Sequence, residues 1–437
     1  MSATARPLPL RLPSFRNLII TRAAVMMALQ AQAVIVGWQM YSLTQDVFML
    51  GLIGLTEAIP AICCALVAGH VVDNGDPKKI LIAAVGALGL NTLMLTLCAG
   101  GYIALPPATI VSMLFVGMFF SGLARGFVSP SSFIILSRIV ERKDMPSAAA
   151  WQSSAFQTAA VLGPAIAGLV YGKFGVHTVW LMPAVLMAVA ICLVFTLRPK
   201  PAPARMDARE PAIKSISAGW NYILRHPTLL SMMALDMFAV MFGGALAMLP
   251  AYAHDVLNVG AEQLGMLRAS PAIGAILTAL FFAIRPMRYI VAKRLLFVVT
   301  GYGVAMICFG LSREFWLSAA LLALGGAFDS VSMIMRGTLM QLLTPDHMKG
   351  RLSSINSMFI ISSNEIGAFV QGSVASLIGL VPGILFGGSM TLLVVALTGG
   401  LSPSFRNTVV DSEAPHEPPP LGTPDPIEPE VEKVPVA

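Results

Sequence analysis

The stretch LIAAVGALGLNTLMLTLCAG, residues 81–100, decides the fold class of this chain. It contains no charged residue and matches the roughly 20 residues that a helix needs to cross about 30 Å of hydrocarbon. Similar blocks recur along most of the chain, and none alternates apolar and polar residues as a barrel strand does. A chain in lipid must satisfy its backbone hydrogen bonds internally, so we expect these blocks to be membrane-spanning helices.

The composition of the whole chain also indicates membrane embedding. Of 437 residues, 56% are hydrophobic and 11% are charged, and the mean hydropathy is +0.78; a soluble domain carries about 25% charged residues. The five cysteines lie inside apolar blocks without a CxxC pair or a histidine cluster, so the sequence indicates no disulfide framework and no metal site. The net charge of +6 is carried by loops between the blocks, so we expect membrane lipid and no nucleic acid as a partner.

Charges, prolines and glycines divide the chain into twelve predicted spans, which makes it an all-α polytopic membrane protein. The spans cover residues 18–42, 48–72, 80–100, 108–137, 147–172, 176–197, 229–253, 261–284, 295–312, 315–343, 352–378 and 381–402. Residues 18–197 and 229–402 thus form two six-helix bundles. We expect a cytoplasmic lead at 1–17, a cytoplasmic linker with an amphipathic helix at 198–228, and an acidic, Pro-rich, disordered cytoplasmic tail at 403–437.

Basic residues predict the orientation of the chain. Almost all Lys and Arg outside the spans lie on connections that share a side with the N-terminus, whereas the opposite connections hold only Lys173 and Arg313. Such an asymmetry in short loops marks the cytoplasmic side. The N-terminal segment lacks a short apolar region that ends in a cleavage site, so we expect both termini in the cytoplasm.

The two bundles are related by an internal repeat. A shift of 204 positions places Gly122 on Gly326 and spans four and five on ten and eleven. The same shift places Gly163 on Gly367 and Gly168 on Gly372. Parallel six-helix repeats with a substrate site at their interface are typical of carriers that work by alternating access.

Two short motifs resemble signatures of the major facilitator superfamily. GHVVDNGDPKK at 69–79 resembles the GxxxD(R/K)xGRK loop between helices two and three, although Asn74 replaces the usual base. VLGPAIAG at 161–168 resembles the GPxxGG motif of antiporters. The resemblance implies a gating role for the matching residues, which are Gly69, Asp73, Lys78, Lys79, Gly163, Pro164 and Gly168.

Longer strings are similar to bacterial exporters of the enterobactin exporter type. They include IVGWQMYSLT at 35–44, LDMFAVMFGGALAMLPAYAHDVL at 235–257 and LGMLRASPAIGA at 264–275. This resemblance implies a secondary active exporter of a small molecule in the bacterial inner membrane, proton-coupled and monomeric, with a siderophore favoured over the broader substrates of a multidrug antiporter. The sequence has no P-loop, HExxH or GxSxG motif, so we expect no cofactor and no enzyme. A non-transporting membrane scaffold is the alternative from another class.

Charged residues inside the spans are the candidate functional groups, because each costs about 2.5–3.5 kcal/mol at a helix centre. Glu57, Asp236 and Glu365 are candidates for proton coupling, since burial raises the pKa of a carboxyl group. The candidate substrate or cavity residues are Arg125, Asp329, Arg268, Trp38, Gln39, Gln152 and Asn356. Arg125 and Asp329 are related by the 204-residue shift, and we hypothesise that they pair or share the substrate. Arg22, nearer the cytoplasmic end of its span, is expected to snorkel or to close an inner gate.

Overall fold

The computed structural model describes residues 12–141, 144–199, 220–285, 289–345, 348–407 and 409–411. Ten helices in these ranges are long and apolar enough to cross a membrane. One of them, α5, makes two crossings, and α12 adds another whose apolar part is Ile366–Ile378. The prediction of a twelve-helix, all-α membrane fold is confirmed.

Two of the five helices of the first half begin at an aspartate whose side chain caps the helix. Its helices are α1 (Pro13–Thr44), α2 (Val47–Asn74), α3 (Pro77–Ala99), α4 (Pro107–Ile139) and α5 (Met145–Phe195). The Asp76 carboxylate accepts hydrogen bonds from the backbone N–H groups of Lys78 and Lys79 and caps α3, with Pro77 at the first helical position. Such a cap satisfies N–H groups that have no partner inside the helix.

The second half has an irregular first span. It comprises α7 (Pro227–Gly243), η3 (Ala245–Met248), α8 (Leu249–Ala251), η4 (Tyr252–Val256), α9 (Ala261–Ile284), α10 (Ala292–Leu311), α11 (Phe315–Leu343), α12 (Lys349–Ile378) and α13 (Leu380–Leu401). We predicted one regular span at 229–253, but the backbone leaves the helical region at Gly244 and continues as 3₁₀ and π turns. Gly243, Gly244 and Pro250 explain the break, because glycine disfavours a helix and proline removes a hydrogen bond.

The turns between the last two spans of each half show the repeat directly. Gly175 (φ +76°) interrupts α5, and Gly379 (φ +96°) separates α12 from α13. Both glycines adopt the positive φ that other L-residues avoid, and they are 204 positions apart.

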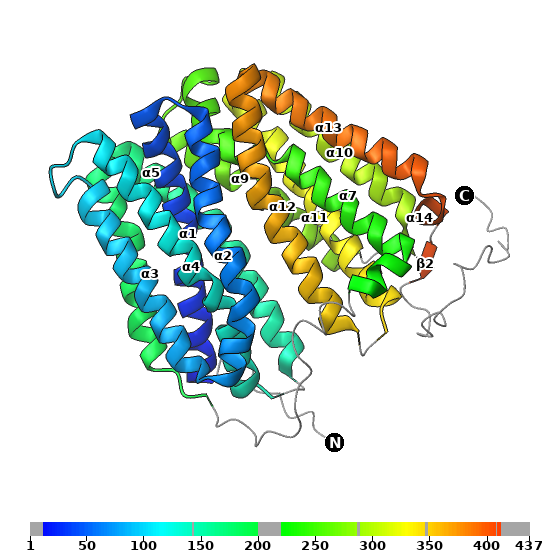
Figure 1. Ribbon diagram of the computed structural model, residues 1–437, viewed down its shortest axis with the longest axis horizontal. Coiled ribbons are helices and arrows are strands. Elements are labelled where there is room, and N and C mark those ends of the chain that lie inside the picture. The colour runs from blue at the N-terminus through cyan, green and yellow to red at the C-terminus, as the bar shows by residue number, and fades with distance from the viewer. Residues whose placement is uncertain are drawn as a thin grey trace.

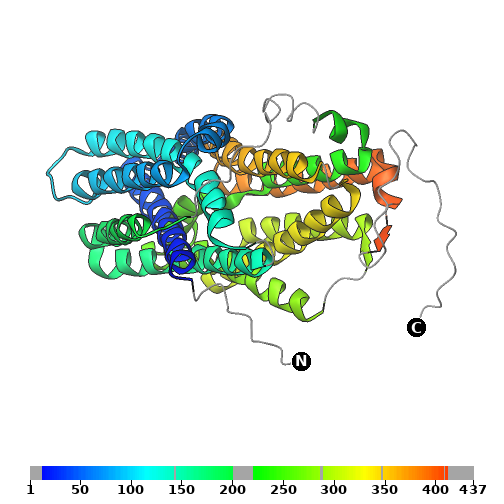
Figure 2. The same cartoon turned by 90° about the horizontal axis from the view of Figure 1, so that it is seen from below.

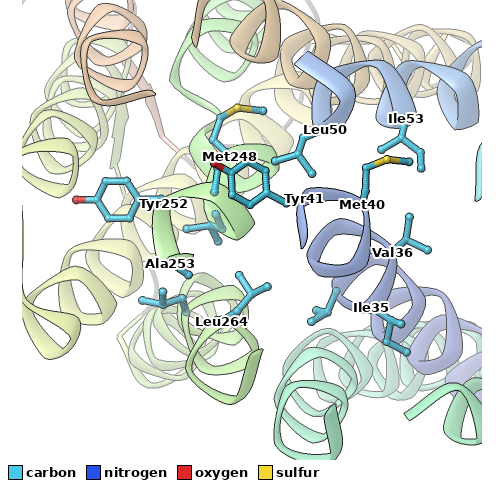
Figure 3. Packing of buried hydrophobic residues seen from close by; sticks show 14 of the residues in the cluster. Ile35, Val36, Met40, Tyr41, Leu50, Ile53, Met248, Tyr252, Ala253 and Leu264 are labelled. Atoms are coloured by element: carbon cyan, nitrogen blue, oxygen red, sulfur yellow. The ribbon is translucent and has the colours of Figure 1, made fainter. Parts of the chain in front are cut away.

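The structure consists of two helical bundles that converge at one end and diverge at the other (Figure 1). We call the end where α1 begins the terminal side and the end where α1 finishes the opposite side. A joint cluster of buried apolar residues at the opposite side draws on both halves and includes Met40, Tyr41, Met248, Tyr252 and Leu264 (Figure 3).

The buried clusters at the terminal side are different, because each stays within one half. The first-half cluster contains Phe15, Leu18 and Leu136, and the second-half cluster contains Leu229 and Met335. The two halves therefore pack on each other through the opposite side, whereas each is an independently packed unit at the terminal side.

The region after α13 begins with ordered structure. We expected 403–437 to be disordered, but α14 (Pro403–Asn407) buries Phe405 completely in the second-half cluster. Strand β2 (Val409–Asp411) then pairs antiparallel with β1 (Tyr289–Val291). Apolar burial and strand pairing account for this difference. Residues 1–11 of the lead, 200–219 of the linker and 412–437 of the tail lie outside the described residues.

Candidate functional site between the two halves

Glycines allow the two halves to approach closely at the opposite side. A Cβ atom on Gly168 of α5 would lie 2.6 Å from both the Ala261 carbonyl oxygen and the Gly265 Cα of α9. The repeat-related Gly372 of α12 meets Gly51 of α2 at 2.8 Å in the same way. Only residues without a side chain permit such backbone contact.

The motif that suggested a gate therefore lies partly at the interface between the halves. The Pro164 carbonyl oxygen lies 2.6 Å from the Cβ position of Gly265, so this part of the motif faces α9. Gly163 instead faces α1 of its own half, where a Cβ would lie 2.9 Å from the Met27 carbonyl oxygen.

Polar contacts reinforce the junction at the opposite side. The Tyr41 hydroxyl of α1 donates a hydrogen bond to the Asp255 carboxylate of η4, and the His254 ring lies 2.7 Å from the other oxygen of that carboxylate. Trp38 and Tyr41 make edge-to-face contacts with the His254 ring. Trp38, a predicted cavity residue, thus lies at the junction of the two halves.

Arg268, another predicted substrate residue, also crosses between the halves. Its guanidinium donates a hydrogen bond of 3.3 Å to the Ala33 carbonyl oxygen of α1. The side chain therefore contacts the first half in this conformation.

Among the described residues, two ion pairs hold charged groups inside the separate halves. The Arg125 guanidinium of α4 lies 3.1 Å from the Glu57 carboxylate of α2. In the second half, Arg336 of α11 pairs with Asp236 of α7, and both side chains are about nine-tenths buried. Each pair joins two helices of one half, and the Asp236 pair is the more completely removed from solvent.

In this conformation, the structure pairs Arg125 with a residue other than Asp329, the partner that we hypothesised. Arg125 is paired with Glu57. Asp329 lies in the second half, where it lines a small space with Asp236, Tyr302 and Ser332. Equivalent positions in a repeat need not face each other, so the shared-substrate part of the hypothesis stays a prediction.

A larger cavity opens within the first half, between α1, α4 and the beginning of α5. It has a volume of about 290 Å³ and is lined by Arg22 and Gln152 together with apolar residues and two phenylalanines. Its inner wall includes Ile19 and Leu136, which also belong to the first-half cluster. Gln152, a candidate cavity residue, thus lies on this cavity beside Arg22, which the sequence led us to expect to snorkel or to close an inner gate.

Several predicted residues have other surroundings. Gln39 is buried: its amide donates to the Ala99 carbonyl oxygen (2.7 Å) and accepts from the Trp180 indole (3.1 Å). It therefore joins helices of the first half. Asn356 of α12 is half-buried. The side chain of Glu365 lies outside the described residues.

The loop motif is described only in part. The side chain of Asp73 and the surroundings of Gly69 lie outside the described residues. The Lys78 ammonium donates a hydrogen bond to the Phe195 carbonyl oxygen at the end of α5, and Lys79 is exposed. Lys78 thus caps the end of α5 within the first half.

Twelve helices in two repeated bundles, with charged groups buried inside each bundle and a cavity in the first half, are the architecture of a secondary transporter of the major facilitator superfamily. The chain belongs to the family of transmembrane secretion effectors, which matches residues 4–424. It is similar to the enterobactin exporter EntS of Escherichia coli O1:K1 / APEC, with 25% identity over 392 residues that cover 88% of this chain and 92% of the relative. The predicted resemblance is confirmed, and the family is one of transporters rather than enzymes.

Solved structures show the same fold. A POT family transporter in complex with a thioalcohol-conjugated peptide has a TM-score of 0.71 at 12% identity, covering 90% of this chain and 96% of that one. A bacterial homologue of the iron transporter ferroportin in an inward-facing state has a TM-score of 0.67 at 13% identity, covering 90% and 98%. At such low identity the likeness establishes the fold alone.

Proposed function

We propose that this chain exports a small organic molecule from the bacterial cytoplasm across the inner membrane by alternating access, driven by inward proton movement. A siderophore of the enterobactin kind is the favoured substrate. Similarity to the enterobactin exporter over 88% of the chain supports this choice, as does a cavity whose charged lining residue is an arginine.

One structural observation carries the proposal: the buried cores of the halves are joined at the opposite side and separate at the terminal side. The basic connections lie on the terminal side, which the positive-inside rule assigns to the cytoplasm. A transporter in this conformation receives its substrate from the cytoplasm. Release on the other side requires that the junction around Tyr41 and Asp255 open.

Proton coupling has a physical basis in the two ion pairs. Protonation of Asp236 or Glu57 removes the negative charge that holds the partner arginine, so it loosens α7 from α11 or α2 from α4. A proton taken up from one side and released to the other would thereby change helix packing within a half.

The export proposal is tested in an Escherichia coli strain that makes enterobactin but lacks its own exporter. Expression of this chain should restore enterobactin in the medium and lower the amount retained in cells. An equal membrane level of protein with no change in either amount would overturn the siderophore assignment. If ethidium efflux rises in the same cells, the multidrug alternative replaces it.

Coupling is tested in proteoliposomes loaded with substrate. An imposed pH gradient should drive uphill transport in the wild type, and Asp236→Asn and Glu365→Gln should weaken the response to the gradient while facilitated flux remains. Undiminished coupling in both variants would remove these two residues as proton carriers.

A further inference from the structure

The repeat allows each charged group in one half to be compared with its counterpart in the other. Gly163 packs against the Met27 carbonyl oxygen, and its counterpart Gly367 packs against the Met241 carbonyl oxygen, both at 2.9 Å from the Cβ position. Met27 of α1 therefore corresponds to Met241 of α7, and the shift for these helices is 214 rather than 204 positions.

With this shift, Arg22 of α1 corresponds to Asp236 of α7. The two halves thus carry opposite charges at equivalent positions. Asp236 is neutralised within its half by Arg336 of α11. The α4 residue that corresponds to Arg336 under the 204-residue shift is Ser132, which has no charge to offer Arg22.

Within the part of the chain that the structure describes, Arg22 therefore lacks the counter-charge that its counterpart Asp236 has in Arg336. Among the described residues no hydrogen bond or ion pair involves its guanidinium, whereas Arg125 and Arg336 are ion-paired and Arg268 donates to a carbonyl oxygen. The side chain is half-buried and lines the cavity of about 290 Å³. A cation removed from bulk water without a partner is costly, so this site favours an anion that comes from outside the chain.

The other residues that line the cavity indicate the chemistry of the rest of that ligand. Phe133 and Phe156 are 60% and 46% exposed and flank the cavity, and Met26 adds an adaptable apolar surface. Gln152 and Ser153 supply hydrogen-bonding groups beside the charge. Aromatic rings around one cation suit a flat apolar molecule that carries an anionic group.

The position of the cavity suits a substrate rather than a structural ion. The beginning of α5 forms one wall, and α5 packs on α9 of the other half. Seen from below, α1, the end of α4 and the beginning of α5 lie toward the middle of the molecule, beside the second half (Figure 2). A ligand seated there contacts a surface that the second half covers or exposes as the halves move.

We propose that the cavity around Arg22 is a binding subsite for an aromatic anion, with the guanidinium holding the anionic group and the two phenylalanines holding the ring. This inference rests on the proposed export function and names the chemical class that the first half recognises. A carboxylate, a phenolate and a lipid phosphate share the required charge, so the test distinguishes a soluble ligand from a lipid.

The test compares binding of 2-naphthoate with that of the neutral 2-naphthamide to the purified full chain in nanodiscs of uncharged lipid, by titration calorimetry. The wild type should bind the acid more tightly than the amide. Arg22→Gln should weaken acid binding by about tenfold or more, the usual effect of losing a hydrogen bond to a charged group, and leave amide binding unchanged. Arg16→Gln, an exposed position on the same helix, is the matched control and should retain wild-type affinity for both.

Equal binding of naphthoate to the wild type and to a folded Arg22→Gln variant would overturn the subsite. If phosphatidylglycerol replaces the uncharged lipid and competes with naphthoate at Arg22, naphthoate binding would be lost. That result would assign the cavity to a lipid headgroup and would overturn the proposed subsite as well. Phe133→Ala should weaken acid and amide alike. The enterobactin export assay is independent of these titrations, so wild-type export with no Arg22-dependent binding refutes the subsite alone, whereas binding without export refutes the transport proposal.

Discussion

Replacement of Gly168 by alanine is expected to shift the protein away from the conformation described here. The new Cβ would lie 2.6 Å from the Ala261 carbonyl oxygen and from the Gly265 Cα, whereas ordinary contact begins at 3.4 Å. The difference of 0.8 Å must be met by separation of α5 from α9, since both atoms belong to the backbone and no side chain can turn aside. The substitution therefore strains the junction between the halves at the opposite side.

The magnitude follows from the cost of overpacking, which is about 1–3 kcal/mol. If the strain is relieved when the halves separate at the opposite side, the ratio of the two conformations changes by about 5–150-fold. Gly372→Ala should act in the same direction but less strongly, because its closest contact is 2.8 Å from the Gly51 Cα. Gly86→Ala is the control, since nothing lies within 4 Å of its Cβ position.

Pulsed electron paramagnetic resonance measures the effect. Spin labels are placed at Ser137 of α4 and Gln341 of α11 in a chain without native cysteines. Both positions are exposed and lie near the helix ends at the terminal side. Gly168→Ala should move the distance distribution toward shorter values, because the terminal side closes as the other side opens. An unchanged distribution in a variant with normal thermal stability would refute the role of this contact.

Three further substitutions test the packing of charges and rings. Asp236→Asn leaves Arg336 buried without its counter-charge and should lower the free energy of unfolding by about 3–5 kcal/mol. In thermal unfolding, the double variant with Arg336→Gln should lose less stability than the two single variants lose in sum. Tyr41→Phe removes the hydroxyl that bonds to Asp255 across the halves and should raise the population open at the opposite side by about tenfold or more, measured with the same label pair; no shift would refute the latch. Phe405→Ala empties a fully buried site and should cost about 3–5 kcal/mol, seen as a lower unfolding midpoint; an unchanged midpoint would show that α14 does not stabilise the second half.

The sequence alone predicts the spans well, because the length and apolarity of a block depend on the membrane rather than on neighbouring helices. Its limits appear at Gly244, where a block apolar enough to span is broken by local backbone chemistry. They appear again at Gln39, whose polarity suggested a cavity surface while its amide in fact joins three segments of the first half. Apolar patterning does not say which way a polar side chain faces when every side of the helix is apolar.

The candidate site was harder to predict than the fold because the repeat has more than one shift. The shift of 204 is correct for α5 and α12, but on α1 it pairs Asp236 with the uncharged Gln32. The 214-residue relation between α1 and α7 follows only from the contacts of Gly163 and Gly367. Arg22 was judged by its distance from the end of its span, and the cavity beside it depends on α4 and α5, which sequence spacing does not place.

The arrangement of contacts constrains how a proton affects transport. The ion pairs of Glu57 with Arg125 and of Asp236 with Arg336 each join helices of one half, so rocking of one half against the other leaves both pairs intact. In the proposed coupling mechanism, protonation of Asp236 would loosen α7 within the second half. Helix α7 leads directly through the break at Gly244 to Asp255, which accepts a hydrogen bond from Tyr41. A change in α7 is therefore transmitted to the junction at the opposite side along a single span. By this argument, loss of coupling in Asp236→Asn should be accompanied by a changed distribution of the terminal-side labels, and a coupling defect with the wild-type distribution would place the proton pathway elsewhere.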